Sequence, residues 1–142
     1  MLSGETHHQL STLAAHEGLR WVAEHFHTAK FASSFGEEDQ VITQLIASQH
    51  LSIGIFTLDT GRLFQETYDL IDLTRANYKI DIDVLFPDAT EVEKYVKDKG
   101  INGFYNSVDN RKECCGIRKI HPLNRALSGV DLWVTGLRRS QS

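Results

Sequence analysis

Apolar residues along this chain alternate between two spacings, and the alternation predicts helices and strands in turn. A spacing of three or four positions, typical of amphipathic helices, covers residues 9–26, 37–49, 64–78 and 90–99. Short apolar or β-branched runs predict strands at Lys30–Phe35, Ser52–Leu58, Ile80–Phe86 and Asp131–Thr135. The pattern therefore predicts strands that are separated by helices.

Two local signals refine the helices. Thr90, followed three residues later by Glu93, resembles a capping box and predicts that Thr90 caps the helix of residues 90–99. Residues 114–127 could form a further helix, which Pro122 would kink or split because proline lacks the backbone N–H.

The order of the elements predicts an α/β fold in which a parallel sheet is flanked by helices on both faces. No repeat or linker divides the sequence, so we expect a single domain over residues 1–142. Parallel sheets bind ligands beyond the carboxyl ends of their strands. The candidate site therefore lies in the loops after residues 34, 58, 86 and 135.

Composition narrows the class of protein. With 41% hydrophobic residues, 24% charged residues and a net charge of −4, the chain resembles a globular protein without a surface for long nucleic acid. Its apolar runs are too short to span a membrane and its N-terminus lacks a signal-peptide core, so we expect a cytoplasmic protein. Cations concentrate between Arg111 and Arg139, which favours a local anion site.

The first candidate motif is the small-residue turn that leads into the second helix, made of Ser33, Ser34, Phe35 and Gly36. Free backbone N–H groups at a helix start attract phosphate or sulfate. The acids at 37–39 would oppose such an anion, and they stabilise a helix start without any ligand. A plain capped helix is therefore the alternative.

The second motif follows the second strand and comprises Leu58, Asp59, Thr60, Gly61 and Arg62. Asp59 and Thr60 can hydrogen-bond a nucleoside, and Arg62 can contact a phosphate. Gly61 permits a positive φ. The alternative is a turn that only carries the chain into the next helix.

The third motif places the adjacent Cys114 and Cys115 among cations, from Arg111 to Lys119. Basic neighbours favour the thiolate, which is the nucleophilic and metal-binding form of cysteine. A disulfide framework is not expected, and two thiols cannot hold a four-iron cluster, which takes four. A buried structural pair is the alternative, although the flanking charges argue against deep burial. A fourth motif, with Gly136, Arg138 and Arg139, would suit an acidic group at the end of the last strand.

Taken together in this order, the four motifs resemble the adenylyl-sulfate and phosphoadenylyl-sulfate reductase family, which has an adenine nucleotide α-hydrolase-like fold. The resemblance runs from about Phe31 to Ser142. The turn at 33–39 looks like the family's pyrophosphate loop and residues 58–64 like its adenosine segment. The pair Cys114-Cys115 looks like that of the cluster-bearing branch, which takes adenylyl sulfate.

The resemblance implies roles for individual residues. Cys114 and Cys115 would be two of the four ligands of a 4Fe-4S cluster, and Lys119 would hold the phosphosulfate and act in catalysis. The remaining implied positions contact the nucleotide or add positive potential: Ser33, Leu58, Gly136, Arg138 and Arg139. The implied reaction is attack by a cysteine thiolate on the sulfur of adenylyl sulfate, which releases AMP. Thioredoxin or a similar thiol donor then frees sulfite.

The sequence also departs from the family pattern. The family's second cysteine pair and its nucleophilic cysteine would lie beyond Ser142, and no cysteine follows Cys115. We therefore expect that the chain is truncated, that it holds no intact cluster and that it does not turn over substrate. The turn reads Ser34-Phe35-Gly36 where cluster-bearing members have Phe-Ser-Gly, which leaves phosphoadenylyl sulfate open as the substrate. An inactive adenine-nucleotide-binding module, an ATP-pyrophosphatase-like enzyme and a homo-oligomer also stay open.

Overall fold

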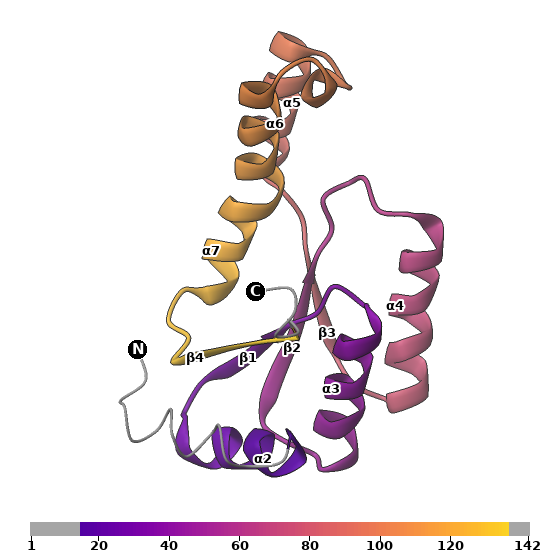
Figure 1. Cartoon of the computed structure of the whole chain (residues 1–142), viewed down its shortest axis with the longest axis vertical. Helices are drawn as coiled ribbons and strands as arrows, with labels where there is room; N and C mark the ends of the chain where they lie inside the picture. The colour runs from indigo at the N-terminus through magenta and orange to yellow at the C-terminus, as the bar shows by residue number, and fades with distance from the viewer. Residues whose placement is uncertain (1–14, 137–142) are drawn as a thin grey trace.

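A four-stranded parallel sheet forms the centre of the protein (Figure 1). The computed structural model describes residues 15–136. In the order β3-β2-β1-β4, the strands are β3 (Ile82–Leu85), β2 (Ile53–Leu58), β1 (Ala29–Ala32) and β4 (Leu132–Thr135). Since all four strands are parallel, their carboxyl ends lie along one edge of the sheet.

Helices connect the strands. The first three are α2 (Ala15–His25), α3 (Glu37–Ser48) and α4 (Gln65–Tyr78). A helical arm then connects β3 to β4 and consists of α5 (Ala89–Lys99), η1 (Gly103–Tyr105), α6 (Val108–Cys115), η2 (Gly116–Ile120) and α7 (His121–Leu127). Figure 1 shows this arm rising beyond the strand ends. No helix among residues 15–136 is both long and apolar enough to cross a bilayer.

The main hydrophobic core lies on one face of the sheet. Alternate strand residues such as Phe31, which is 0% exposed, point to this face and pack with Leu19 of α2, Ile46 of α3 and Ile71 of α4. A strand presents every second side chain to the same face, so the nearly continuous apolar runs also supply a second apolar face.

The arm uses that second face. Phe56 of β2 is 1% exposed, α7 contacts β2, and Pro122 and Ala126 of α7 are buried. The chain thus passes from β1 to β3 over the first face and returns to β4 over the second. This change of direction falls between β1 and β4, where doubly wound sheets open a ligand-binding crevice. The prediction of a parallel sheet with helices on both faces is confirmed.

Two local predictions, the cap of α5 and the end of β1, differ from the structure. Thr90 does not cap its helix: Asp88 does, because its carboxylate accepts the Glu91 N–H at 3.0 Å. The strand expected over residues 30–35 ends at Ala32, and Phe35 takes a left-handed conformation with φ 64°.

The helix expected from Cys114 begins six residues earlier, at Val108, where the Ser107 side chain accepts the Asn110 N–H. Pro122 does not split it. The wider π-turn η2 precedes the proline, and the backbone N–H of His121 bonds to the Gly116 carbonyl five residues back. Proline has no backbone N–H to donate, and the π-turn lets the helix continue without that hydrogen bond.

Candidate functional site

A cavity of about 390 Å³, here called the strand-end cavity, opens where β1, β2 and β4 end. Its floor is the second sheet face, because Ala32 and Phe56 are partners in the β1–β2 register and Leu58 follows Phe56 by two. Trp133 of β4 and Leu123 of α7 complete the apolar walls. Of the four loops predicted to hold the site, those after residues 34 and 58 contribute to the lining of this cavity, whereas no described residue of the loops after 86 and 135 does.

Polar groups are few and line the same cavity. They belong to six of the lining residues: Ser33, Ser34, Thr57, Thr60, Thr67 and Lys119. Apolar walls with a small number of placed polar groups are typical of sites for small organic ligands. The cavity therefore suits a ligand with a flat apolar part and an anionic end near Lys119.

The carboxylate of Asp39 holds the turn after β1 in place. Both the N–H and the hydroxyl of Ser34 donate to Asp39 Oδ2, each at 2.6 Å, and the Phe35 N–H donates to Ser33 Oγ at 3.1 Å. Asp39 is 6% exposed. These two amides are therefore engaged within the protein, and the phosphate-binding interpretation of this turn stays a prediction beside the alternative of a plain capped helix. The Phe35 side chain is buried in the core and does not line the cavity.

Gly136 packs against the same acid. A Cβ at Gly136 would overlap Asp39 Oδ1, so only glycine fits there. Asp39 thus connects the Ser34 turn to the end of β4, and Gly36, Asp39 and Gly136 line a neighbouring pocket. Arg138 and Arg139, expected to add positive charge nearby, lie outside the described residues.

The turn after β2 has a similar internal anchor. Asp59 is buried, and its Oδ1 accepts the Gly61 N–H and the Tyr68 O–H, both at 2.8 Å. The hydrogen bond to Asp59, together with burial, raises the pKa of Tyr68. Gly61 has the predicted positive φ, 82°. The Asp59 carboxylate is thus directed inward, while Thr60 lines the cavity.

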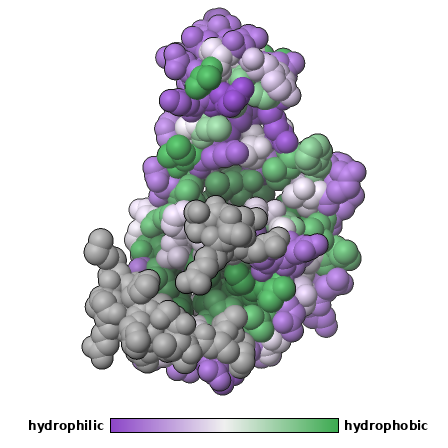
Figure 2. Space-filling view, in the orientation of Figure 1, coloured by the Kyte–Doolittle hydropathy of each residue, from purple (hydrophilic) through white to green (hydrophobic). Residues whose placement is uncertain are grey.

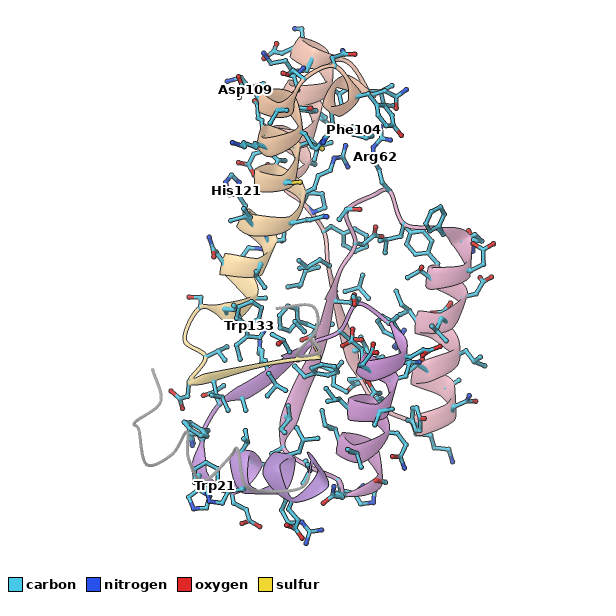
Figure 3. All side chains as sticks on the ribbon, in the orientation of Figure 1. Trp21, Arg62, Phe104, Asp109, His121 and Trp133 are labelled. Carbon is cyan, nitrogen blue, oxygen red and sulfur yellow. The ribbon has the colours of Figure 1, made fainter. Side chains whose placement is uncertain are left out.

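Arg62 turns away from the strand-end cavity and toward the arm (Figure 3). Its guanidinium donates to the Ile101 carbonyl and, at 3.0 Å, to Asn102 Oδ1. It also lies 4.4 Å from the centre of the Phe104 ring, a cation–π contact. Arg62 therefore joins the β2–α4 turn to the tip of the arm.

A second cavity, of about 310 Å³, contains both cysteines and is called the thiol cavity. Its lining includes the two thiols and four cations: Cys114, Cys115, Arg62, Arg111, Arg118 and Lys119. Cys114 is buried, Cys115 is partly exposed, and neither forms a disulfide. Within residues 15–136, no group of three or more His, Cys, Asp or Glu side chains could hold a metal ion.

The two cavities meet. Thr60, Leu63 and Lys119 line both of them, and the Arg118 guanidinium donates to the Thr60 carbonyl. The cysteine pair and the Ser33 turn therefore lie on the same side of the molecule. Figure 2 shows that the upper part of the arm is mostly hydrophilic, whereas apolar surface gathers where the arm meets the body.

Burial also fixes the arm behind the thiols. The Tyr95 hydroxyl of α5 donates to the Asn110 carbonyl of α6 at 2.9 Å, and desolvation raises the pKa of Tyr95. This contact holds α5 against the helix that carries Cys114.

Sequence reasoning missed several residues of the site. Trp133 was included only as part of the last predicted strand, Phe104 was assigned to no motif, and the tether from Arg118 joins segments 58 residues apart. The one available signal was parity, because Trp133 alternates with the core residues of β4 and so faces away from the core.

Comparison with known proteins identifies the family of the chain. Residues 28–142 match the phosphoadenosine phosphosulfate reductase domain family, and the chain belongs to that family. It is 48% identical over 124 residues to an adenosine 5'-phosphosulfate reductase from Burkholderia cepacia, covering 87% of this chain and 50% of the relative. Against the enzyme of that name from Neisseria meningitidis serogroup B, it is 48% identical over 140 residues, covering 98% of this chain and 57% of the relative. The chain thus spans about half the length of these curated relatives.

The fold has a solved counterpart. A crystal structure of phosphoadenylyl-sulfate reductase from Candida auris, in a phosphate complex, superposes with a TM-score of 0.83 at 28% identity. The match covers 99% of this chain and 71% of that one. The predicted adenine nucleotide α-hydrolase-like fold is confirmed.

Proposed function

We propose that the chain binds adenylyl sulfate and serves its reduction to sulfite and AMP in sulfate assimilation; phosphoadenylyl sulfate is the second candidate substrate. The observation that carries the proposal is the meeting of the two cavities at Lys119, one apolar and sized for a nucleoside, the other lined by thiols and cations. The names and identities of the relatives support it.

In this proposal the adenosine occupies the strand-end cavity, with Ser33, Leu58 and Thr60 as its neighbours. The phosphosulfate extends toward Lys119, whose ammonium neutralises the charge of the sulfonate. A cation placed in advance where negative charge accumulates stabilises the transition state, because it needs no reorganisation during the reaction. Arg118 positions Thr60 through its carbonyl.

The thiol cavity fits one side of a 4Fe-4S cluster in chemistry. Cys114 and Cys115 would supply two thiolates, and the surrounding cations would offset the negative charge of a thiolate-bound cluster. Such a cluster would supply an iron–sulfur centre in the thiol cavity, which Lys119 also lines. Four thiolates are required, so the remaining two are proposed to come from the part of the relatives that this chain does not span.

The same part is proposed to supply the nucleophile. Its cysteine thiolate attacks the sulfur of adenylyl sulfate, the S–O bond to the phosphate breaks, and AMP leaves with the electron pair. The product is an enzyme thiosulfonate. A dithiol donor such as thioredoxin then reduces the S–S bond, is oxidised to its disulfide and releases sulfite.

Calorimetric titration of the chain with AMP and with adenylyl sulfate tests the proposal. We expect one molecule of either nucleotide to bind, and adenylyl sulfate to bind more tightly. Binding of neither would overturn it. A sulfite assay with dithiothreitol as donor, run on a protein that joins this chain to the part proposed to supply the nucleophile, separates a reductase from a module that only binds the nucleotide.

A further inference from the structure

Trp133 lies at the strand-end cavity with an exposed indole. It stands on β4 opposite Lys30 of β1, which in turn pairs with Gly54 of β2, so the side chain belongs to the second sheet face. It is 46% exposed although it lines the cavity together with Ala32 and Leu123. Figure 3 labels it between the end of α7 and the sheet. A large aromatic left half-exposed beside a cavity is a ready contact surface for a ligand.

The other apolar walls are aliphatic except for Phe56, which is 1% exposed and therefore offers the cavity almost no ring surface. Leu58, Leu63 and Leu123 contribute branched, uneven surfaces. Among the described residues that line the cavity, the indole of Trp133 alone combines a flat aromatic face with substantial exposure.

We propose that the purine base of the nucleotide stacks on Trp133, and that this contact makes the site selective for ligands with a flat base. The inference rests on the proposed function and goes beyond it by assigning the base-binding residue. Stacking on an aromatic side chain stabilises a bound base through overlap of the two π-faces. Trp133 lies on β4 of the sheet and Lys119 on η2 of the arm, and in this proposal the base contacts the first and the phosphosulfate end the second.

Fluorescence tests the contact directly, because the chain has two tryptophans. Trp21 lies on α2, stacked on His25 with ring centres 4.0 Å apart, and packs against the core on the first face. In Trp21→Phe, the emission comes from Trp133 alone. We expect saturating AMP to quench this emission and ribose 5-phosphate, at the same concentration, to leave it unchanged. An unchanged emission at saturating AMP would overturn the inference.

Affinity gives an independent measurement. Trp133→Ala should weaken AMP binding about tenfold, and Trp133→Phe should restore it to within about threefold of the parent, as expected for base stacking. Trp133→Leu keeps the bulk without the aromatic face and should resemble Trp133→Ala. Circular dichroism confirms that each variant is folded.

The outcomes separate the two proposals. If the parent binds AMP and Trp133→Ala binds it equally well, the base-binding role is wrong while the proposed function stands. If Trp133→Leu binds as well as Trp133→Phe, the indole only fills space and the stacking role is again wrong. If the parent binds neither AMP nor adenylyl sulfate, the proposed function itself fails.

Discussion

The strand-end cavity and the thiol cavity share a wall but are built in different ways. The first rests on the sheet: its floor follows from strand register, and Phe56 beneath it is buried under α7. The second lies on the arm, where single side chains of Arg62, Arg118 and Tyr95 tether one segment to another. Topology therefore fixes the position of the strand-end cavity, whereas individual polar contacts set the geometry of the thiol cavity. Substitutions in the two regions should therefore differ in their effects on the free energy of unfolding and on ligand binding.

The largest effect is expected from Phe56→Ala in the sheet. Removing a fully buried ring should lower the free energy of unfolding by about 3–4 kcal/mol and abolish AMP binding at the same time. Phe64→Ala is the matched control, because that ring is 79% exposed. Urea unfolding of both variants checks this. A stable Phe56→Ala that has lost only AMP binding would mean that the cavity is not part of the fold's core.

Next in size is Gly136→Ala. The new Cβ would overlap Asp39 Oδ1 and force the Ser34 turn to shift, at a cost of about 2 kcal/mol. Gly18→Ala on α2 is the control, since nothing lies within 4 Å of its Cβ and alanine favours a helix. Thermal unfolding compares them. Equal stability of the two variants would contradict the packing of Gly136 against Asp39.

Lys119→Ala should affect the binding of adenylyl sulfate and of AMP to different extents, which distinguishes the two cavities. We expect adenylyl sulfate to bind about tenfold more weakly and AMP to lose less than about threefold, as for one lost charge-assisted contact at the sulfonate end. Lys94→Ala, an exposed lysine elsewhere on the arm, should change neither. Calorimetry of both ligands measures the ratio, and equal losses for the two ligands would place Lys119 at the wrong end of the nucleotide.

The smallest effect is expected from Tyr68→Phe, which removes the O–H donor to Asp59 and should cost about 1 kcal/mol. The pKa of Tyr68 is raised in the folded protein, so its stabilising contribution is fully present below pH 10 and declines as the pH rises through the folded-state pKa. The difference in unfolding free energy between parent and variant should therefore shrink at alkaline pH. Tyr78→Phe, an exposed tyrosine on the same helix, supplies the control, and a difference that grows with pH would show that the sign is wrong.

The sequence predicted what depends on periodicity and missed what depends on contacts between distant segments. The apolar, β-branched run at Ser52–Leu58 predicted the strand that is β2 (Ile53–Leu58), and parallel strand ends placed the turns at Ser33 and Thr60 beside one cavity. The start of α6 was missed because residues 108–113 are almost all polar and show no apolar spacing. The cap of α5 was misassigned because Asp88, Thr90 and their neighbours offer competing capping patterns.

The side-chain roles were harder still. Arg62 and Asp59 were both considered as possible ligand contacts. In the structure Arg62 contacts the arm and lines the thiol cavity, and Asp59 anchors its own turn, so their contact with a ligand stays a prediction. Side-chain direction in a loop depends on which partners tertiary packing brings near, and no local pattern contains that information. Asp39 was interpreted as an acid that would repel an anion. In the structure its carboxylate accepts a hydrogen bond from the Ser34 N–H.

We propose that one nucleotide spans both cavities, with its base at the strand ends and its anionic end at Lys119. Amide chemical-shift mapping during titration tests this most directly. AMP should shift resonances around Ser34, Thr60 and the Trp133 indole, and adenylyl sulfate should add shifts at Arg118, Lys119 and Cys115. Shifts confined to α2 and the amino ends of the strands, or the same pattern for both ligands, would contradict it.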